Sequence, residues 1–512
     1  MDTFALDNLP PREQWPVLHE MDYPSQLNAA VELLGGPWAD RPCVLGDEET
    51  WTYAELRERA ERIARVLVED MGLVPGNRVL LHGPNGPALV ACWFAVLLAG
   101  GVVVATMPLL RAGELAKVIR RAQISHGLVD ARLADEVRKA GGLRELLTFD
   151  ELGERAAAAG GFEPVATSRD DVALIAFTSG TTGEPKGCVH FHRDVLAICD
   201  TFARKILDPS PEDVFTGTAP LAFTFGLGVL VLFPMRFGAS FAPVATPGMD
   251  PLVETVRRHG VTTLATAPTM YRALLRASAD LSSLRTCVSA GEPLPAGVAR
   301  AWHERTGIRI VDGIGSTEML HIFIAARAEA SKFGSVGTPV PGYEAIVVDA
   351  DMRPLAAREV GRLAVRGPTG CRYLSDPRQT EYVIDGWNVT GDAFRVDEDG
   401  YFWFEARNDD LIVSSGYNIS PFEVETALLE HDAVAECAVV ASPDEDRGHV
   451  GKAFVVLTEG TPGDTALATA LQDHVKQHIA PYKYPRRVEF LDALPRTPTG
   501  KVQRTELRGM ET

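Results

Sequence analysis

The chain has 512 residues, of which 46% are hydrophobic and 23% charged, and its formal net charge at pH 7 is −19. This composition is typical of a folded globular protein and excludes a disordered or fibrous chain. A nucleic-acid-binding surface needs clustered lysine and arginine, so the acidic balance argues against that class of partner. At roughly 100–200 residues per domain, we expect two to four domains or subdomains.

The N-terminus and the cysteines predict a soluble cytoplasmic protein. Residues 1–16 contain acids and prolines without an apolar run, so they are not a signal peptide. The seven cysteines include no C-x-x-C pair, and we expect reduced thiols with neither a zinc site nor a disulfide framework. The most apolar stretch, 88–110, is cut by Gly100–Gly101 well short of the ~20 residues that a membrane span needs. It predicts a buried helix followed by a buried strand.

From residue 41 to about 330, helical patterns alternate with short apolar runs. A helix is predicted over 52–70, and strands over 77–83, 100–107 and 171–178. Near-continuous apolar strands separated by helices are typical of parallel sheets covered on both faces. The segment 154–161, ERAAAAGG, is predicted as a surface loop.

The C-terminal third has a different sequence pattern. Between 336 and about 408, frequent Gly and Pro interrupt short alternating strands, which favours a small β-barrel-like part. Beyond about 410 we expect a compact α+β unit. Its helix over 420–431 has Ser420 as cap, Pro421 at the first position and Glu423 three residues after the cap, and a strand follows over 433–441.

One loop, TSGTTGEPKG at 178–187, has the composition of a phosphate cradle. It follows an apolar strand, and its glycines let backbone N–H groups turn toward an anion. It is not a Walker loop, because Gly180 and Gly183 are too close together and Lys186 follows a proline. Taken alone, a loop of this composition is more often a mobile surface connection, so composition does not decide between the two.

The exact string TSGTTGEPKG resembles the signature of the adenylate-forming superfamily of acyl- and aryl-CoA synthetases, adenylation domains and luciferases. Four further motifs similar to those of this family follow in the family's order. They are GSTE at 315–318, VTGD at 389–392, RNDDLIVSSGYNISPFEVE at 407–425 and PRTPTGKVQR at 495–504. The resemblance spans about residues 30–508.

The resemblance implies an α/β fold with two parts. An N-terminal domain, 1–408, would bind ATP and the acid through two parallel-sheet subdomains and the barrel-like part at about 336–408. A mobile α+β C-terminal domain, 409–512, would turn about the hinge Asp409 and supply the catalytic Lys501. The implied enzyme is an AMP-forming ligase that makes an acyl-adenylate from ATP, releases pyrophosphate, and passes the acyl group to coenzyme A.

The resemblance also implies a role for individual residues of each motif. Catalytic roles fall to Lys186, Thr317, Glu318 and Lys501, and Glu318 takes the place of the magnesium-associated carboxylate. These types suit the chemistry, because two anions must react and catalysis of such transfers is mostly positioning and electrostatics. The implied ATP-binding residues are Thr178, Ser179, Gly180, Thr181, Thr182, Gly183, Lys186, Ala290, Gly291, Glu292, Asp312, Gly313, Gly315, Ser316, Thr317, Asp392, Arg407 and Lys501.

Four other segments resemble the benzoate-CoA ligase branch, including 2-aminobenzoate-CoA ligases: 6–16, 225–235, 312–323 and 418–425. The resemblance implies an acid pocket made by Phe223, Thr224, Phe225, Gly313, His321 and Ile322. Phe225 stands where benzoate ligases commonly have tyrosine, so the pocket wall lacks one hydroxyl. Substituted benzoates and bulkier cyclic acids both remain open.

The resemblance places the thiol tunnel at Ser415, Gly416, Tyr417, Lys483 and Arg486. Between 476 and 508 the chain has eight Lys/Arg against three acids, which either meet the CoA phosphates or form a solvated face. The alternative acceptor is a carrier protein supplied in trans, since we find no carrier domain. A non-catalytic nucleotide-binding protein is a third hypothesis, which the presence of both Lys186 and Lys501 disfavours. We expect a monomer or homodimer without nucleic-acid or membrane partners.

Each residue also has a structural interpretation. Glu318 alone could be an acid at a helix start, Asp392 and Arg407 one more surface ion pair, and Lys501 a solvated tail lysine. Phe223 and Phe225 could fill the core, and His321 could be a satisfied buried histidine. Five motifs in family order make these interpretations improbable together, so the sequence predicts the ligase.

Overall fold

The structure is a computed structural model that describes residues 1–178, 184–244, 246–277, 279–407, 410–414, 417–444, 447–497 and 501–510. Of Tyr417 only the backbone is described. Eight of the predicted site residues lie outside the described residues: Ser179, Gly180, Thr181, Thr182, Gly183, Asp409, Ser415 and Gly416.

The first sheet of the N-terminal part has six strands among the described residues, in the order β6-β5-β3-β4-β7-β8. All neighbours pair in parallel except β7 and β8, which form an antiparallel hairpin. The three strands predicted over this region are confirmed by β3, β4 and β7. The bounds are β3 Arg78–His82, β4 Val102–Thr106, β5 His126–Val129, β6 Glu145–Thr148, β7 Val172–Thr178 and β8 Lys186–Phe191.

The second sheet has nine strands among the described residues, in the order β15-β14-β13-β12-β11-β9-β10-β1-β2. Its centre, from β1 to β13, is parallel, and β2, β14 and β15 add antiparallel edges. The bounds are β1 Pro42–Leu45, β2 Thr50–Thr52, β9 Val214–Gly217, β10 Ser240–Phe241, β11 Thr263–Thr266, β12 Thr286–Ser289, β13 Ile310–Gly315, β14 Ile322–Ala325 and β15 Thr338–Pro339.

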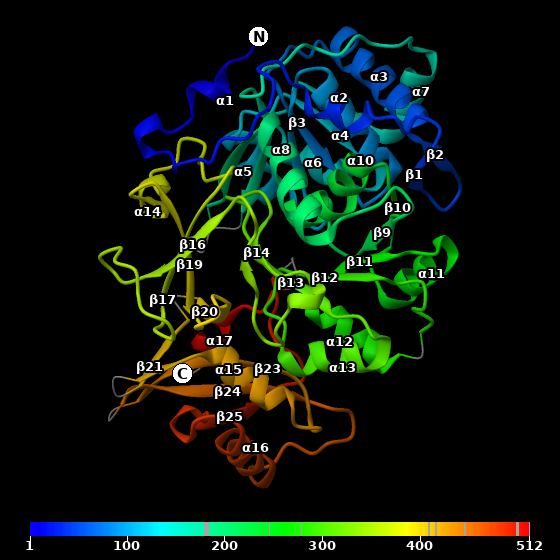
Figure 1. Cartoon of the computed structure of the whole chain (residues 1–512). Coiled ribbons are helices and arrows are strands. Elements are labelled where there is room, and N and C mark those ends of the chain that lie inside the picture. Colours follow the sequence, from blue (N-terminus) through cyan, green and yellow to red (C-terminus); the bar gives the residue numbers. More distant parts are fainter. Residues whose placement is uncertain are drawn as a thin grey trace.

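Helices cover both sheets (Figure 1). The predicted helix 52–70 is α3, which Thr52 and Glu55 begin with a reciprocal capping box. The apolar stretch 88–110 folds as the buried α4 followed by β4, as predicted. The prediction of a loop at 154–161 is wrong for residues 154–158, because α7 continues to Ala158: four consecutive alanines favour helix.

The remaining helical segments of the N-terminal part are short and mostly amphipathic or buried. Two of them, η3 and η4, are π-helical. The bounds are α1 Phe4–Asp7, η1 Arg12–Gln14, α2 Ala29–Leu34, α3 Tyr53–Glu69, α4 Pro87–Leu98, α5 Ala112–Arg121, η2 Ala131–Leu133, α6 Ala134–Ala140, α7 Phe149–Ala158, α8 His192–Ile198, η3 Cys199–Leu207, α9 Thr224–Leu227, η4 Gly228–Leu232, α10 Phe233–Phe237, α11 Met249–His259, α12 Pro268–Arg276, α13 Ala296–Thr306 and η5 Ala328–Ala330.

The barrel-like part is an antiparallel sheet that starts at Glu344, because β15 still pairs with the second sheet. Its described strands run β16-β17-β19-β18, and β20 pairs with β19. The bounds are β16 Glu344–Val348, β17 Gly361–Arg366, α14 Gln379–Tyr382, β18 Val383–Ile384, β19 Trp387–Val396 and β20 Phe402–Arg407.

The C-terminal α+β unit, orange to red in Figure 1, has its own buried cluster around Val424, Val439 and Val455. The predicted cap is confirmed, since the Ser420 side chain accepts from the Glu423 N–H. The bounds are β21 Ile412–Ser414, β22 Tyr417–Ile419, α15 Pro421–Leu429, β23 Val434–Asp444, β24 Gly448–Leu457, α16 Thr465–His478, η6 Pro481–Lys483, β25 Arg487–Phe490 and α17 Arg504–Gly509. No helix in the described parts of the chain could cross a bilayer.

Candidate active site

Three segments with predicted site residues leave one edge of the second sheet. Strands β9, β11, β12 and β13 run parallel, so their carboxyl ends lie at the same edge. The segments that leave this edge are 218–225 after β9, 290–292 after β12 and 312–318 at the end of β13. Ligands of open α/β sheets bind in the crevice outside the carboxyl ends of the strands. The fold therefore assembles one site from three distant stretches.

The β7–β8 hairpin from the other sheet faces this edge. Thr178 and Lys186 are Cα partners at its open end, so the predicted phosphate loop connects two residues that the sheet holds side by side. The Thr178 hydroxyl oxygen is buried and has no hydrogen-bond partner among the described residues. An unpaired buried hydroxyl is costly, which suits a group reserved for a ligand.

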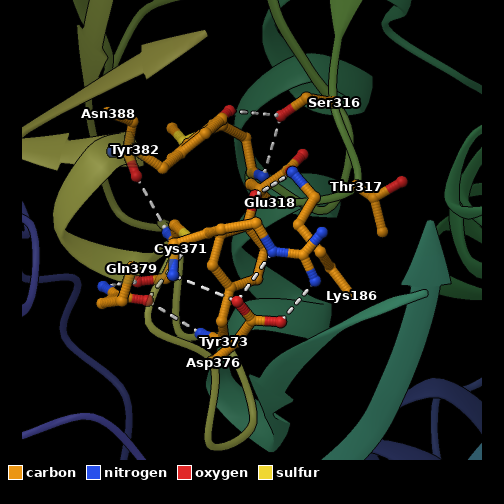
Figure 2. Close-up of polar contacts among 12 residues, drawn as sticks. Lys186, Ser316, Thr317, Glu318, Cys371, Tyr373, Asp376, Gln379, Tyr382 and Asn388 are labelled. Atoms are coloured by element: carbon orange, nitrogen blue, oxygen red, sulfur yellow. Dashed lines mark hydrogen bonds and ion pairs between the residues drawn. The ribbon is translucent and has the colours of Figure 1, made fainter. Parts of the chain in front are cut away.

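Lys186, Tyr373 and Glu318 form a polar triangle (Figure 2). Lys186 Nζ donates to the Tyr373 hydroxyl at 2.8 Å, and this hydroxyl donates to Glu318 Oε1 at 2.5 Å. Lys186 Nζ also lies 3.5 Å from Glu318 Oε1. Burial and the Glu318 carboxylate raise the pKa of Tyr373, so its hydroxyl stays protonated and able to donate. The structure thus brings two predicted catalytic residues together through one that the sequence did not single out.

Tyr373 is itself fixed by its neighbours. The Gln379 side-chain oxygen accepts from the Tyr373 N–H at 2.9 Å, and the Tyr382 hydroxyl lies 3.3 Å from the Ser316 hydroxyl.

Glu318 sits in a turn between β13 and β14, so its interpretation as an acid at a helix start is wrong. Leu320 in the same turn has φ +66°, a strained conformation of the kind that clusters at functional sites.

Beneath the turn lies a buried polar chain that sequence reasoning missed. His190 Nε2 donates to the Thr317 carbonyl at 2.8 Å, and Asp194 pairs with Arg372 at 2.7 Å. His190 Nδ1 lies 3.8 Å from Asp194, and none of these three side chains is exposed. Period two along the strand places Lys186 and His190 on one face, which is the signal that could have found His190.

Replacing Asp194 by alanine should lower the free energy of unfolding by about 3–5 kcal/mol, because it leaves the Arg372 charge buried without its partner. Burial acts to raise the pKa of Asp194, but Arg372 and His190 outweigh it and lower the value. Urea unfolding followed by circular dichroism measures the change. The matched control is Asp170→Ala, whose half-exposed pair with Arg193 should contribute within about 1 kcal/mol. Equal losses in the two variants would contradict the argument.

Asp312 is a second unpaired group at the sheet edge. Its Oδ1 and the Ser289 hydroxyl on the adjacent strand are buried without hydrogen-bond partners in the described part of the chain. Burial raises the pKa of Asp312 to about 7. A polar ligand in the crevice would satisfy these atoms, which agrees with the predicted ATP-binding role of Asp312.

The raised pKa gives Asp312→Asn a pH-dependent effect on stability. A carboxyl group whose pKa is raised in the folded state destabilises the fold. The effect grows as the pH rises from the ordinary pKa of the carboxyl to its raised pKa. The asparagine variant should therefore melt at higher temperature than the native protein. The gap should widen from pH 4 to about pH 7 and stay constant above it. A gap independent of pH would contradict the assignment; Asp351→Asn, in an exposed turn, is the control.

Asp392 and Arg407 do form an ion pair, with Arg407 NH1 2.7 Å from Asp392 Oδ1. They are Cα partners on β19 and β20. The pair is not simply a surface one, because Asp392 is buried while half of Arg407 is exposed. Burial raises the pKa of Asp392, and Arg407 opposes that rise.

Two pairs of the predicted acid-pocket residues lie in contact, Phe225 with His321 and Gly313 with Ile322. Phe223, Thr224 and Phe225 are half-buried at the start of α9, so the two phenylalanines do not simply fill the core. Gly313 and Ile322 lie on adjacent strands, and a Cβ on Gly313 would come within 2.7 Å of Ile322. A glycine is therefore required there for close approach.

His321 is buried against Phe225, Phe202 and Phe233, with ring centroids 4.6–5.8 Å away. Burial lowers its pKa to about 3, so the ring is neutral. Its Nε2 lies 3.4 Å from the Phe225 carbonyl, whereas Nδ1 has no partner among the described residues. It is therefore not the fully satisfied histidine of the structural interpretation.

Lys501 belongs to the C-terminal unit, yet its charge acts on the N-terminal site. Burial raises the pKa of Glu292 at the end of β12, and the charges of Arg496, Arg272 and Lys501 lower it in turn. Lys501 itself is exposed, and its backbone N–H donates to Thr497 Oγ1. The Lys501 charge thus acts on Glu292, which follows β12 at this edge of the second sheet.

The basic residues at the C-terminal end are largely paired within their own unit. Lys483 pairs with Glu423 at 2.5 Å, Arg496 with Glu436 at 2.6 Å and Arg504 with Glu425 at 2.6 Å. Arg486 donates to the Tyr484 hydroxyl at 3.0 Å. Most of this surface is therefore neutralised, which favours the solvated-face interpretation over a basic CoA patch for these side chains.

Comparison with known proteins gives consistent results. Residues 36–373 match the model of the AMP-binding enzyme family, and residues 423–501 match that of the AMP-binding enzyme C-terminal domain. A benzoate–CoA ligase of Thauera aromatica is 37% identical over 508 residues, covering 95% of this chain and 96% of that protein.

Two solved structures are similar over nearly the whole chain. The anthranilate CoA ligase AuaEII in complex with anthranoyl-AMP superposes with TM-score 0.91 at 32% identity, covering 96% of this chain and 98% of that one. A benzoate CoA ligase of Burkholderia xenovorans LB400 superposes with TM-score 0.87 at 33% identity, covering 94% and 100%.

Proposed function

We propose, from the premise that this chain belongs to the AMP-binding enzyme family, that Lys186, Glu318 and Lys501 activate a benzoate-like acid with ATP at the edge of the second sheet. The enzyme is an AMP-forming acid–thiol ligase of the benzoate- and aminobenzoate-CoA ligase branch. It activates an aryl acid as its adenylate and transfers the acyl group to CoA. The observation that carries the residue assignment is the joining of Lys186 to Glu318 through the Tyr373 hydroxyl at the edge of the second sheet.

In the first step a carboxylate oxygen of the acid attacks the α-phosphorus of ATP, and the bond to the β-phosphate oxygen breaks. Both reactants are anions, so their repulsion must be cancelled where they meet. We assign this to the Lys501 ammonium, between carboxylate and α-phosphate. Lys186, held by Tyr373 and Glu318, neutralises negative charge on the departing pyrophosphate.

Glu318 also fits a magnesium ion brought by the nucleotide. Mg²⁺ is usually held by one or two carboxylates together with substrate phosphates, and Glu318 offers hard oxygens beside the predicted phosphate loop. When bound, the ion would neutralise phosphate charge. Tyr373 and Lys186 orient the carboxylate by occupying Oε1.

In the second step the CoA thiolate attacks the acyl carbon and AMP leaves. Lys501 has no role in this step, so we propose that the C-terminal unit, from about residue 409, rotates to take it away. Arg300 and Glu430, 3.8 Å apart, form an ion pair between the two parts that is exposed and weak. A rotation that breaks this pair therefore loses little electrostatic energy.

The acid pocket supports a planar ring. Phe223 and Phe225 present apolar surface, and the neutral His321 leaves no cation in the pocket wall. Such sites are mostly apolar with a few polar groups that fix orientation. We propose benzoate or a 2-amino- or hydroxybenzoate as the substrate, in a cytoplasmic enzyme.

The test is a pyrophosphate-release assay with benzoate, 2-aminobenzoate, 4-hydroxybenzoate, cyclohexanecarboxylate and octanoate, each with and without CoA. We expect an aromatic acid to give the highest kcat/KM, and CoA to yield its thioester. A phosphopantetheinyl carrier replaces CoA in a parallel arm. Preference for octanoate would contradict the ring pocket, and faster transfer to the carrier would contradict CoA as acceptor. Phe225→Tyr should change the ranking of acids, with little effect on the KM for ATP.

A further inference from the structure

Away from the nucleotide site, two histidines and a glutamate gather on the C-terminal unit. Glu430 ends α15, while His474 and His478 are four residues apart on α16 and so share a helix face. One ligand atom from each of the three lies within 4.8 Å of the others. The cluster contains no cysteine, so the cysteine spacing of the sequence could not reveal it.

The hydrogen bonds of the two rings prepare them to bind a metal. His474 Nε2 lies 3.0 Å from the Ala427 carbonyl, and His478 Nδ1 lies 2.7 Å from the His474 carbonyl. A carbonyl only accepts, so these nitrogens carry the protons, and Nδ1 of His474 and Nε2 of His478 keep their lone pairs. Histidine ligands of metals almost always donate their other N–H to such an acceptor.

The side chains of His478 and Glu430 are exposed, so an ion has free access and both can adjust. This adjustment has to bring the ligand atoms to the separation of about 3.3 Å that a tetrahedral zinc site requires, given Zn–N bonds of ~2.0–2.1 Å.

We propose that Glu430, His474 and His478 bind a divalent transition metal, with Zn²⁺ as the best match. Two imidazoles and one carboxylate suit zinc, and they leave a fourth position for water. Magnesium is a poor fit, since it prefers oxygen ligands in octahedral geometry. The site is separate from the magnesium site proposed at Glu318.

The site also touches the boundary between the two parts of the chain. Glu430 Oε1 lies 3.8 Å from Arg300 NH2 on α13 of the N-terminal part, and a Cβ on Gly297 would lie 3.9 Å from Glu430. A bound metal and Arg300 therefore compete for one carboxylate. Metal binding should weaken the arrangement of the two parts in which Arg300 pairs with Glu430, and Arg300 should weaken metal binding by the same factor. This coupling, unlike the site itself, rests on the proposed function.

The test titrates Zn²⁺ into the untagged, EDTA-treated full-length protein by isothermal calorimetry, without ATP or acid. We expect one saturable equivalent, and Co²⁺ in its place should give the visible absorption of a tetrahedral complex. His478→Ala and Glu430→Gln should each lower the affinity at least ~10-fold. His478 is chosen because His474 also satisfies a carbonyl of α15, so its loss would disturb the fold. The control His259→Ala, at the end of α11, should leave the affinity unchanged.

Absence of a saturable equivalent, or equal binding by native protein and His478→Ala, would overturn the site. The coupling has its own readout: Arg300→Gln should raise the Zn²⁺ affinity several-fold, because it removes both a competitor and a positive charge. Unchanged affinity in this variant would overturn the coupling and leave the site standing. Neither result depends on catalytic activity, so failure of the proposed function would be recognised separately by the pyrophosphate assay.

Discussion

Replacing Lys501 by alanine is expected to slow carboxylate-dependent pyrophosphate release by about 10²–10³-fold, the range found when one preorganised charge-stabilising group is removed. The reason is electrostatic: we assign the ammonium to the meeting point of two anions, and its charge is among those that lower the pKa of Glu292 after β12. Thioester formation from a supplied acyl-adenylate should fall far less, because Lys501 has no role in that step. Both rates are measured with the acid that performs best in the panel.

Lys476→Ala is the matched control for this variant. Lys476 is a half-exposed lysine of the same C-terminal unit, paired with Asp473. Its replacement removes the same charge from the protein and should leave both rates within about twofold of the native enzyme. Equal loss of both half-reactions in Lys501→Ala would show that the lysine supports the fold rather than adenylation.

Glu318→Gln should reduce pyrophosphate release by about 10²-fold and raise the magnesium concentration needed for half-maximal rate. Glutamine keeps the volume and an oxygen for the Tyr373 hydroxyl, but it removes the charge that lies 3.5 Å from Lys186 and that we assign to the metal. The variant thus separates loss of charge from loss of shape. The measurement is the rate as a function of Mg²⁺ at saturating ATP and acid.

Glu381→Gln serves as the control, since Glu381 is exposed on α14 near Tyr373 and contacts neither Lys186 nor Glu318 through any bond described here. It should leave the rate and its magnesium dependence unchanged. If Glu318→Gln lowered the rate without any change in magnesium dependence, the carboxylate would act only by positioning Lys186 and Tyr373.

The sequence predicted the parts of the fold that depend on local pattern. Apolar runs of four to eight residues predicted β3, β4 and β7, and the helix over 52–70 followed from its apolar face, to which the structure adds the Thr52–Glu55 capping box. The loop predicted over 154–161 overlaps a helix instead, because the helix propensity of the alanines carries α7 to Ala158.

The motifs of the site were readable because phosphate and carboxylate chemistry needs particular residue types in short, contiguous strings. Lys186, Glu318, Asp392 and Lys501 could be named for this reason, and their family resemblance agrees with the relatives found. The residues that position these groups could not be predicted from the sequence. Tyr373 lies 187 positions from Lys186, and His190 lies 127 positions from Thr317, so neither pairing leaves a local pattern.

The amino-acid sequence by itself determined the α/β class, which depends on periodicity, and through short motifs it predicted the order of the two parts and the reacting groups. Only the tertiary structure decided which polar side chains lose their water and which partners they find. That is why the Tyr373 bridge, the raised pKa of Asp312 and the cancellation of the basic C-terminal surface emerged from the folded chain. Burial and pairing are properties of distances through space, and a linear order of residues does not contain them.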